Sequence, residues 1–311
     1  MTENEIMLSI IVPTYNHQNY IKQALDSILK QKTDYQYEVL VGEDCSTDNT
    51  RAILKEYEKE HPGFMTVFYR NENMSNKPIH NSLDLKMRSK GKYLILLEGD
   101  DYWISEYKIQ RQIDFLEEHK DYVAVAHNCI VVDENSNKTN EKYPECNHEL
   151  YTICDFCNNI FPGQSTTIML RNYFRYPYCD YSIMKKNLSP GDQLNIFVLV
   201  SAGNIYCIQE SWSAYRHITS NGDSYSANYK YDFHKREEWN YELLKYAKKI
   251  QKKTSIRCAE DKYFETLTRG LRMGQLSIIG FCGRFLNIKY KISTLKAYMI
   301  KKEQIRKGEN I

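Results

Sequence analysis

The chain has 311 residues, with 42 Lys or Arg against 40 Asp or Glu and a formal net charge of +2. Apolar residues at 42% and charged residues at 26% are ordinary for a globular protein and exclude a disordered or collagen-like chain. The near balance of charge argues against a general nucleic-acid binder, which carries a large basic excess. That balance conceals a split, because residues 241–311 hold 17 basic and 6 acidic side chains (+11) and the first 240 residues hold 25 and 34 (−9).

The first hundred residues alternate between apolar, β-rich runs and segments with apolar residues at helical spacing. Strands are predicted at residues 8–12, 37–41, 64–70 and 93–97, and helices at residues 16–30, 51–60 and 81–90. This alternation predicts right-handed βαβ units in a mostly parallel sheet flanked by helices, which is an α/β fold. Ligands of such sheets bind beyond the carboxyl ends of the strands, so the residues that follow each strand are the first candidates for a site.

Acidic side chains are concentrated at those strand ends. Glu43 and Asp44 follow the second strand, and Glu98, Asp100 and Asp101 follow the fourth. The chain contains neither the Gly-x-Gly-x-x-Gly of a dinucleotide site nor the Gly-Lys-Ser/Thr of a P-loop. Carboxylate oxygens are the ligands that hard divalent cations prefer, so the pattern predicts a cation site that in turn holds phosphate.

Three segments resemble the family 2 glycosyltransferases with the GT-A fold. They are residues 9–16 (Ser-Ile-Ile-Val-Pro-Thr-Tyr-Asn) with 24–31, residues 39–50, and residues 91–103, which contain Glu-Gly-Asp-Asp. The resemblance implies a Rossmann-like GT-A catalytic domain with a C-terminal helical extension. By the same resemblance, the catalytic domain spans residues 1–230, with a nucleotide-sugar half at about 1–125 and an acceptor half at about 126–230, and a basic helical region spans 231–311.

The family pattern implies roles for residues at the strand ends. Asp44 matches the acid that accepts the N3–H of the nucleotide base, a sensible pairing because a carboxylate only accepts and a pyrimidine imide donates. Capping of the following turn is the alternative for Asp44. Pro13 and Tyr15 match positions that line the base and ribose, although a lone aromatic such as Tyr15 is equally compatible with packing.

The segment at residues 98–101 resembles the family's Asp-x-Asp motif, with Glu98 replacing the usual first Asp. By resemblance, Asp100 and Asp101 contact the ribose and the metal, and Glu98 is a candidate contact of the donor or acceptor sugar. The implied cofactor is Mn²⁺ or Mg²⁺, which would neutralise charge on the departing diphosphate as a Lewis acid. A solvated acidic turn is the alternative, but adjacent like charges at the end of a buried strand are costly without a counter-ion.

A catalytic base is implied at the start of a later helix. An inverting transferase needs a group that takes the proton from the acceptor hydroxyl, and in the family an acidic residue that opens a helix does this. Asp192 follows a Pro-Gly turn and opens an apolar helical run. Asp is also among the best N-cap residues, so capping alone is the alternative.

Further candidates come from the acceptor half. Residues 214–220 resemble the family's Tyr-Arg-x-His-x-x-Ser segment, with one residue fewer between Arg216 and His217. By resemblance His217 completes the metal shell or contacts phosphate, and a solvated surface histidine is the alternative. We expect Gln164 and Ser165, in a turn that leads into a strand, to contact the acceptor or donor sugar. The polar residues 221–229 are a candidate lid over the donor.

The cysteines raise the question of a zinc site. Cys146, His148, Cys154 and Cys157 include a Cys-x-x-Cys pair, but zinc needs four ligands that converge. Because Cys154 and Cys157 lie in a short apolar helical pattern, we favour packed cysteines over a zinc site. With no signal peptide at the acidic N-terminus, we expect all nine cysteines to be reduced thiols and the protein to be cytoplasmic.

The basic C-terminal region has two interpretations. No apolar run reaches the roughly 20 residues of a membrane-spanning helix. Apolar residues interleaved with lysines in residues 241–311 are typical of a segment that meets an anionic membrane surface. The alternative is a helical region whose apolar face packs on the catalytic domain while its lysines are solvated.

The motifs together predict a metal-dependent, inverting glycosyltransferase. Its donor is a nucleotide-diphospho-sugar, with UDP favoured, and its acceptor is a glycan, a lipid-linked or a protein-linked group. The resemblance implies bacterial surface-polysaccharide or glycoprotein assembly, in the cytoplasm or peripherally on the inner face of the cell membrane, with no nucleic-acid partner. The alternatives are a catalytically silent nucleotide-sugar-binding module and an interaction protein that acts through its basic C-terminal region.

Overall fold

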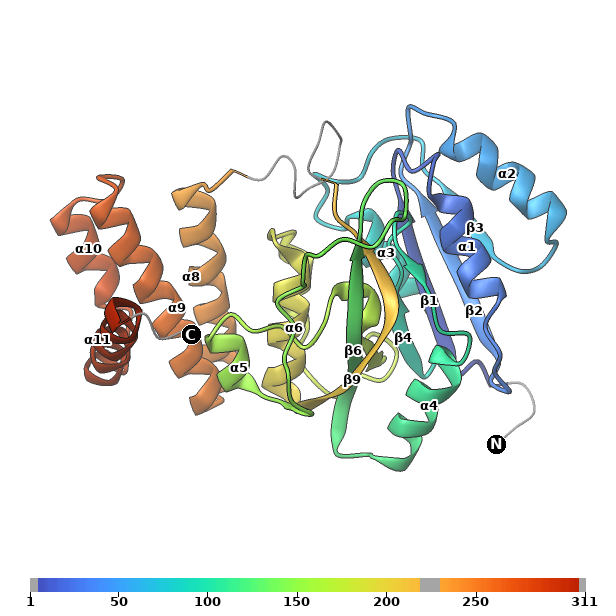
Figure 1. The fold of residues 1–311 in the computed structure, drawn as a ribbon. Coiled ribbons are helices and arrows are strands. Elements are labelled where there is room, and N and C mark those ends of the chain that lie inside the picture. The colour runs from blue at the N-terminus through green and yellow to red at the C-terminus, as the bar shows by residue number, and fades with distance from the viewer. Residues whose placement is uncertain (1–4, 219–229, 308–311) are drawn as a thin grey trace.

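The computed structural model describes residues 5–218 and 230–307, so the candidate lid at 221–229 lies outside the described residues. A central sheet carries helices on both faces, and the C-terminal helices stack at one end of the molecule, on the far side of the sheet from α1 and α2 (Figure 1). Among the described residues, no helix combines the length and the apolar character needed to cross a membrane.

The N-terminal half contains every strand and helix predicted for it. The elements are β1 (Leu8–Thr14), α1 (Ile21–Leu29), β2 (Tyr37–Glu43), α2 (Thr50–Glu60), β3 (Thr66–Tyr69), α3 (Asn81–Arg88) and β4 (Tyr93–Leu96). The four strands pair in parallel in the order β3-β2-β1-β4. Their carboxyl ends therefore meet at one edge, as the βαβ pattern predicts.

Helix α1 begins later than the sequence predicts, at Ile21 rather than Asn16. Asn16 adopts a left-handed backbone conformation with φ of 56°, which a right-handed helix cannot contain. The carbonyl of His17 accepts the N–H groups of Tyr20 and Ile21, so a turn precedes the helix. That turn places His17 directly after β1, at the edge where the strands end.

The second half turns the sheet into a mixed one. Its elements are β5 (Tyr102–Trp103), α4 (Lys108–Glu118), β6 (Tyr122–Val132), β7 (Leu150–Tyr151), α5 (Ile153–Cys157), the 3-10 turn η1 (Ser165–Thr167), β8 (Met169–Arg171), the 3-10 turn η2 (Ser182–Lys186), α6 (Gly191–Ala202) and β9 (Asn204–Arg216). Strand β8 lies antiparallel between β4 and β6, and the path runs β3-β2-β1-β4-β8-β6-β9-β5 with β7 against β9. The first four strands and the β6–β9 pair are parallel, and antiparallel pairs enter with β8, β5 and β7.

Two apolar clusters fill the space between the sheet and its helices. One lies under α1, α2 and α4 and includes Ile10, Leu25, Leu54 and Ile113. The other lies on the opposite face and joins residues of α3, α5 and α6 to residues of the C-terminal helices. The sheet is thus the middle layer of a three-layer sandwich.

The C-terminal region is helical, as predicted. It comprises α8 (Phe233–Ile250), α9 (Lys253–Arg272), α10 (Ile278–Phe285) and α11 (Lys291–Lys307). Trp239 and Leu243 of α8 and Phe264 of α9 are buried in the same cluster as Phe197 of α6. The core therefore continues across residue 230, and the domain division at that residue stays a prediction.

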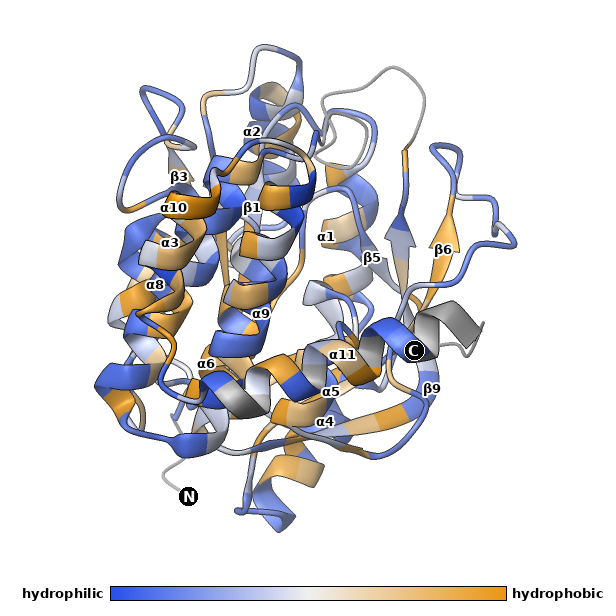
Figure 2. Ribbon diagram, turned by 90° about the vertical axis from the view of Figure 1, so that its left-hand side faces the viewer, coloured by the Kyte–Doolittle hydropathy of each residue, from blue (hydrophilic) through white to orange (hydrophobic). Residues whose placement is uncertain are grey.

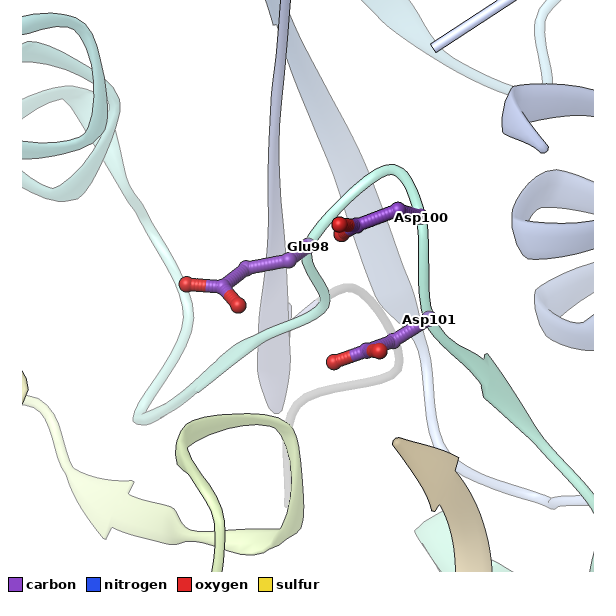
Figure 3. A group of neighbouring side chains, drawn as sticks. All are labelled: Glu98, Asp100 and Asp101. Carbon is purple, nitrogen blue, oxygen red and sulfur yellow. The ribbon is translucent and has the colours of Figure 1, made fainter. Parts of the chain in front are cut away.

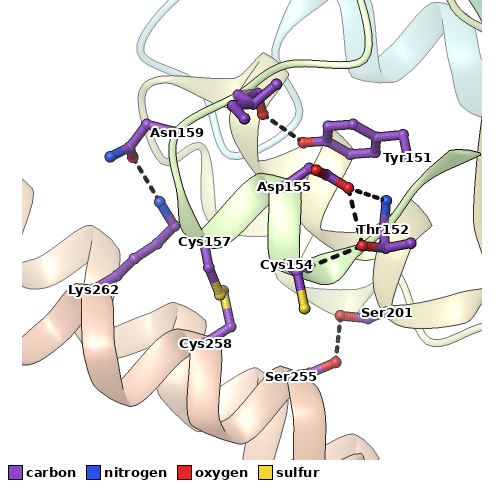
Figure 4. The surroundings of a disulfide bond; sticks show 11 residues. Tyr151, Thr152, Cys154, Asp155, Cys157, Asn159, Ser201, Ser255, Cys258 and Lys262 are labelled. Atoms are coloured by element: carbon purple, nitrogen blue, oxygen red, sulfur yellow. Dashed lines mark hydrogen bonds between the residues drawn. A yellow bond between two sulfur atoms is a disulfide. The ribbon is translucent and has the colours of Figure 1, made fainter. Parts of the chain in front are cut away.

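A disulfide joins α5 to α9 (Figure 4). Cys157 and Cys258 are bonded, with Cα atoms 5.5 Å apart, so the expectation that every cysteine is a reduced thiol is wrong for this pair. The four residues of the possible zinc cluster do not converge. Cys157 is in the disulfide, the Cys146 thiol donates to the carbonyl of His148, and the His148 ring faces Asp155. The cross-link fastens the C-terminal helices to the body of the fold.

Candidate functional site

A short acidic loop, residues 98–101, follows β4 at the edge where the parallel strands end. Glu98, Asp100 and Asp101 project to the same side of this loop (Figure 3), and each offers a carboxylate oxygen within 4.8 Å of the others. Gly99 allows the loop to lie against β1, since a Cβ there would meet His17 Nδ1 at 2.7 Å. Three converging carboxylates are a donor set that suits Mn²⁺ or Mg²⁺.

The three carboxylates have different surroundings. Asp101 is buried, and its two oxygens accept hydrogen bonds from Gln164 Nε2 at 3.0 Å and from the backbone N–H of Arg216 at 2.8 Å. Burial, together with the charges of Asp100 and Glu98, raises the pKa of Asp101 well above its usual range. Among the described residues, the one ion-pair candidate within 4.0 Å of the Asp100 carboxylate is the His17 ring, whose Nε2 is 3.9 Å away. Asp101 is therefore held mainly by protein, and Asp100 is the carboxylate most available to a ligand.

A cavity of about 690 Å³ opens beside the acidic loop. It is lined by four of the residues predicted to act in the reaction, which are Glu98, Gln164, Ser165 and Asp192. These residues lie up to 94 positions apart in the chain, and β4, η1 and α6 bring them together. Burial and the charges of Asp100 and Asp192 raise the pKa of Glu98 to about 8. In the described part of the chain, more of the predicted site residues line this cavity than line the other cavities.

Asp192 lies in the first turn of α6. The N-cap of that helix is Pro190, and no side chain caps it, so Asp192 is not the N-cap residue. Its carboxylate opens onto the cavity and the residue is exposed to solvent, while the protein around it raises the pKa of the carboxyl. Backbone N–H groups of the helix start, together with the charges of Lys86 and Arg236, act in the opposite direction. The residue is thus a carboxylate placed on the cavity wall, as a general base requires.

Two basic side chains that were not predicted from the sequence, Lys86 and Arg236, also line this cavity. Lys86 of α3 is only 9% exposed, and burial lowers its pKa to about 8 against the attraction of Glu98 and Asp192. Arg236 comes from α8, so the C-terminal region contributes to the cavity wall. In the sequence, Lys86 is only a lysine next to the apolar positions of a predicted helix. Its place in the cavity can be inferred only once the buried face of that helix is known.

The predicted nucleotide residues lie apart from this cavity. The Asp44 Oδ1 atom accepts the backbone N–H of Met74 at 2.8 Å, and burial raises the pKa of this carboxyl. Met74 and Arg70 line a second depression of about 560 Å³. Tyr15 is 36% exposed after β1, and Pro13 is half-buried within that strand. In the sheet, β4 lies next to β1, on the side away from β2. The acidic loop that follows β4 therefore lies between the predicted nucleotide residues and the larger cavity.

His217 does not join the acidic group that could hold a metal among the described residues. Its Nδ1 lies 2.6 Å from Glu141 Oε2, in a pair at the surface. The neighbouring Arg216 instead makes the contact with the acidic loop, and its Nε donates to the carbonyl of Asp100 at 2.9 Å. The segment at residues 214–217 therefore does reach the acidic loop, through a residue that the prediction did not single out.

The sheet topology is that of the GT-A fold. The family model described as glycosyl transferase family 2 matches residues 9–176, and the chain belongs to that family of enzymes.

Relatives extend this assignment. An uncharacterised protein of Mycobacterium tuberculosis is 29% identical over 211 residues, which cover 67% of this chain and 58% of that protein. TuaG of Bacillus subtilis, a putative teichuronic acid biosynthesis glycosyltransferase, is 34% identical over 118 residues, or 38% of this chain and 45% of its own length. This chain thus spans less than two thirds of each of these relatives.

A solved structure shares the fold. Residues 1–349 of S. aureus TarS, crystallised with UDP-GlcNAc, match with a TM-score of 0.63 over 98% of this chain and 93% of that chain, at 16% identity.

Proposed function

We propose that the protein is a metal-dependent, inverting glycosyltransferase that moves a sugar from a UDP-linked donor to a glycan, a lipid-linked or a protein-linked acceptor. One observation carries this proposal: Glu98 of the acidic loop and Asp192 of α6 line the same cavity. A sugar bound between them would have its diphosphate beside the acidic loop and its anomeric carbon within reach of an acceptor that Asp192 deprotonates. UDP and UDP-GlcNAc are bound by TarS, which shares the fold, and this supports the donor class.

The chain's own residues divide the work of the reaction. Asp192 accepts the proton of the acceptor hydroxyl as that oxygen bonds to the anomeric carbon and the bond from that carbon to the diphosphate oxygen breaks. Attack from the face opposite the leaving group inverts the anomeric configuration. Asp100 and Glu98, with Asp101 behind them, would hold Mn²⁺ or Mg²⁺. That ion would neutralise negative charge on the departing nucleoside diphosphate.

The nucleotide and sugar contacts follow from the same arrangement. Asp44 would accept from the base, with Tyr15 and Pro13 beside the base and ribose. Gln164 and Ser165 would contact the sugar from the cavity wall, where both are found. We keep His217 as a lower-ranked contact of the phosphates, because its ring is engaged with Glu141.

The biological setting is part of the proposal. TuaG and EpsE of Bacillus subtilis, which are putative glycosyltransferases, and the wall-polymer enzyme TarS are among the relatives. They support a role in bacterial surface-polysaccharide assembly. A peripheral position on the inner face of the cell membrane is consistent with the basic residues 241–311.

Asp192→Asn tests the catalytic role directly. The amide keeps the shape of the side chain but does not accept a proton, so we expect turnover to fall by about 10²-fold or more. Thermal shifts with UDP, with and without Mn²⁺, should stay as in the wild type because nucleotide binding is made elsewhere. Asp180→Asn, at a surface carboxylate paired with Lys249, is the matched control. Unchanged turnover in Asp192→Asn removes this residue from the mechanism.

The donor class needs a separate measurement. Thermal-shift titrations with UDP-, GDP- and dTDP-sugars should show the largest stabilisation with a UDP-sugar, and Mn²⁺ should increase it. Failure of Mn²⁺ to strengthen binding of any nucleotide would instead favour a catalytically silent binding module.

A further inference from the structure

The helices α10 and α11 expose an unusual amount of apolar side chain. The five most exposed large apolar side chains in the described part of the protein all lie on these helices or at the C-cap of α10, and they are 59% to 86% exposed. They are Ile278, Ile279, Leu286, Met299 and Ile300. Figure 2 faces this end of the molecule and shows apolar residues along the outer side of α10. A folded protein rarely leaves such a surface uncovered.

Helix α10 carries one set of apolar side chains that packs on α9 and another that is exposed. Its inner side packs Phe281 and Phe285 against Phe264 of α9, with ring centroids 5.9 and 5.5 Å apart. Its outer side presents Ile278 and Ile279 to solvent, and none of its residues is buried. The contact with α9 therefore accounts for the inner side only. We call the exposed set Ile278, Ile279, Leu286, Leu295, Met299 and Ile300 the C-terminal apolar surface.

The charge around this surface is mostly positive, and the exposed Glu303 follows it on α11. Residues 266–302 contain eight Lys or Arg and no Asp or Glu, and Arg272, Lys289, Lys296 and Lys302 are exposed. Glu237 of α8 pairs with Arg284, and Glu260 of α9 accepts the backbone N–H of Tyr290 at 2.8 Å. The segment therefore combines exposed apolar groups with a net positive charge.

We propose that the C-terminal apolar surface docks on an anionic phospholipid bilayer. Apolar side chains that enter the boundary between headgroups and acyl chains, surrounded by Lys and Arg that meet anionic headgroups, are the two elements of interfacial binding. A second copy of the chain is a poorer occupant, because pairing two such surfaces would bring two segments of net positive charge together.

The docked surface is rigidly connected to the catalytic cavity. Helices α8 and α9 share the core with α6, and the Cys157–Cys258 disulfide fastens α9 to α5. The same helical region supplies Arg236 to the cavity wall. Attachment through α10 and α11 would thus hold the cavity near the bilayer. This inference concerns where the enzyme works, and it does not depend on the transfer chemistry.

Vesicle sedimentation of the full chain tests the proposal. We compare vesicles of phosphatidylcholine alone with vesicles of equimolar phosphatidylcholine and phosphatidylglycerol. Wild-type protein should bind the anionic vesicles at least about 10-fold more tightly, and high salt should weaken this binding. The variant with Ile278→Ser, Ile279→Ser and Leu286→Ser should lose about 10-fold or more of the affinity. The matched control is Ile104→Ser with Leu150→Ser. It changes two exposed apolar residues outside the C-terminal helices and should bind as the wild type.

A second variant separates charge from apolar contact. Lys289→Glu with Lys296→Glu changes exposed side chains only, so it should fold normally and lose binding to anionic vesicles. Far-UV circular dichroism and thermal unfolding check that each variant is folded. Equal binding to neutral and anionic vesicles, or undiminished binding by both variants, would overturn the proposal. It would also be overturned if light scattering showed a wild-type oligomer that the triple variant converts to monomer while neither form binds vesicles.

Discussion

Arg216 donates its backbone N–H to Asp101 Oδ1 at 2.8 Å and joins the end of β9 to a loop 115 residues earlier. The guanidinium of the same residue donates to the carbonyls of Asp100 and Asp133 and to Gln23 Oε1, at 2.8–2.9 Å. The backbone of Arg216 thus fixes a carboxylate, while its side chain fixes the loop that carries the carboxylate. Arg216 therefore holds the acidic loop from outside the loop's own sequence.

Replacing Arg216 by Met should therefore destabilise the fold. The side chain is buried, and its removal deletes its hydrogen bonds to the carbonyls of Asp100 and Asp133 and to Gln23 Oε1, each worth about 1–3 kcal/mol. We expect a total loss of roughly 3 kcal/mol in urea unfolding, together with weaker Mn²⁺ binding. Arg111→Met removes an exposed ion pair with Glu210 and should cost less than about 1 kcal/mol. Equal losses in the two variants would contradict the role assigned to Arg216.

Metal binding should become stronger as pH rises toward 8. Burial and nearby carboxylates raise the pKa of Glu98 to about 8, above its value of about 4.3 in an unfolded chain. The folded protein then holds a proton on Glu98 that the unfolded chain has released, so without metal the stability from this group falls as pH rises from about 4 to about 8. A cation replaces that proton. The rise in Tm on adding Mg²⁺ should be larger at about pH 8 than at about pH 6, and smaller in Asp100→Asn. A shift of the same size at both pH values would argue against this site.

Site residues can be predicted from the sequence when neighbouring residues in the chain determine their position, and not when tertiary packing does. Glu98, Asp100 and Asp101 were predictable because they directly follow an apolar strand, and strand ends mark the ligand edge of a parallel sheet. Lys86 and Arg236 were not, since each reaches the cavity from a helix whose rotation about its axis is set by tertiary packing. Asp192 was predicted from its turn and family pattern, and the structure adds that it faces the same cavity as Glu98.

The C-terminal region shows the same limit. An apolar helix surrounded by lysines is compatible with packing and with membrane contact, and both alternatives were open from the sequence. The structure separates them by helix: Trp239, Leu243 and Phe264 of α8 and α9 are buried in the core, whereas Ile279 and Leu286 of α10 and its cap are exposed. Hydropathy does not distinguish the two sides of α10 because both are apolar.

Gly99 should tolerate no side chain. A Cβ at this position would lie 2.7 Å from His17 Nδ1 and 2.8 Å from Thr14 Oγ1, closer than such atoms approach. Gly99→Ala should push the acidic loop away from β1, reduce Mn²⁺-dependent stabilisation by UDP and lower turnover by about 10-fold or more. Gly191→Ala is the control for stability, because its Cβ would meet no atom within 4 Å and it begins a helix. Wild-type metal dependence in Gly99→Ala would show that the loop can shift without consequence.

Lys86→Met should move the pH dependence of the reaction. The positive charge of Lys86 lowers the pKa of Asp192, while burial raises it. Removing that charge should raise the pKa of Asp192 further, and a base works only when deprotonated. The acid limb of kcat/KM should therefore move to higher pH, by roughly one unit. Met keeps the length and apolar stem of Lys, which limits the loss of packing.

Lys90→Met, at an exposed position just after α3, is the matched control and should leave the acid limb in place. Far-UV circular dichroism and urea unfolding of both variants would separate a change in titration from a loss of folded protein. An acid limb that stays in place in Lys86→Met, in a protein that is fully folded, would mean that Lys86 does not act on Asp192. If instead the limb moves and UDP binding stays as in the wild type, Lys86 is a positioning residue. Its charge then lowers the pKa of Asp192, which lines the same cavity.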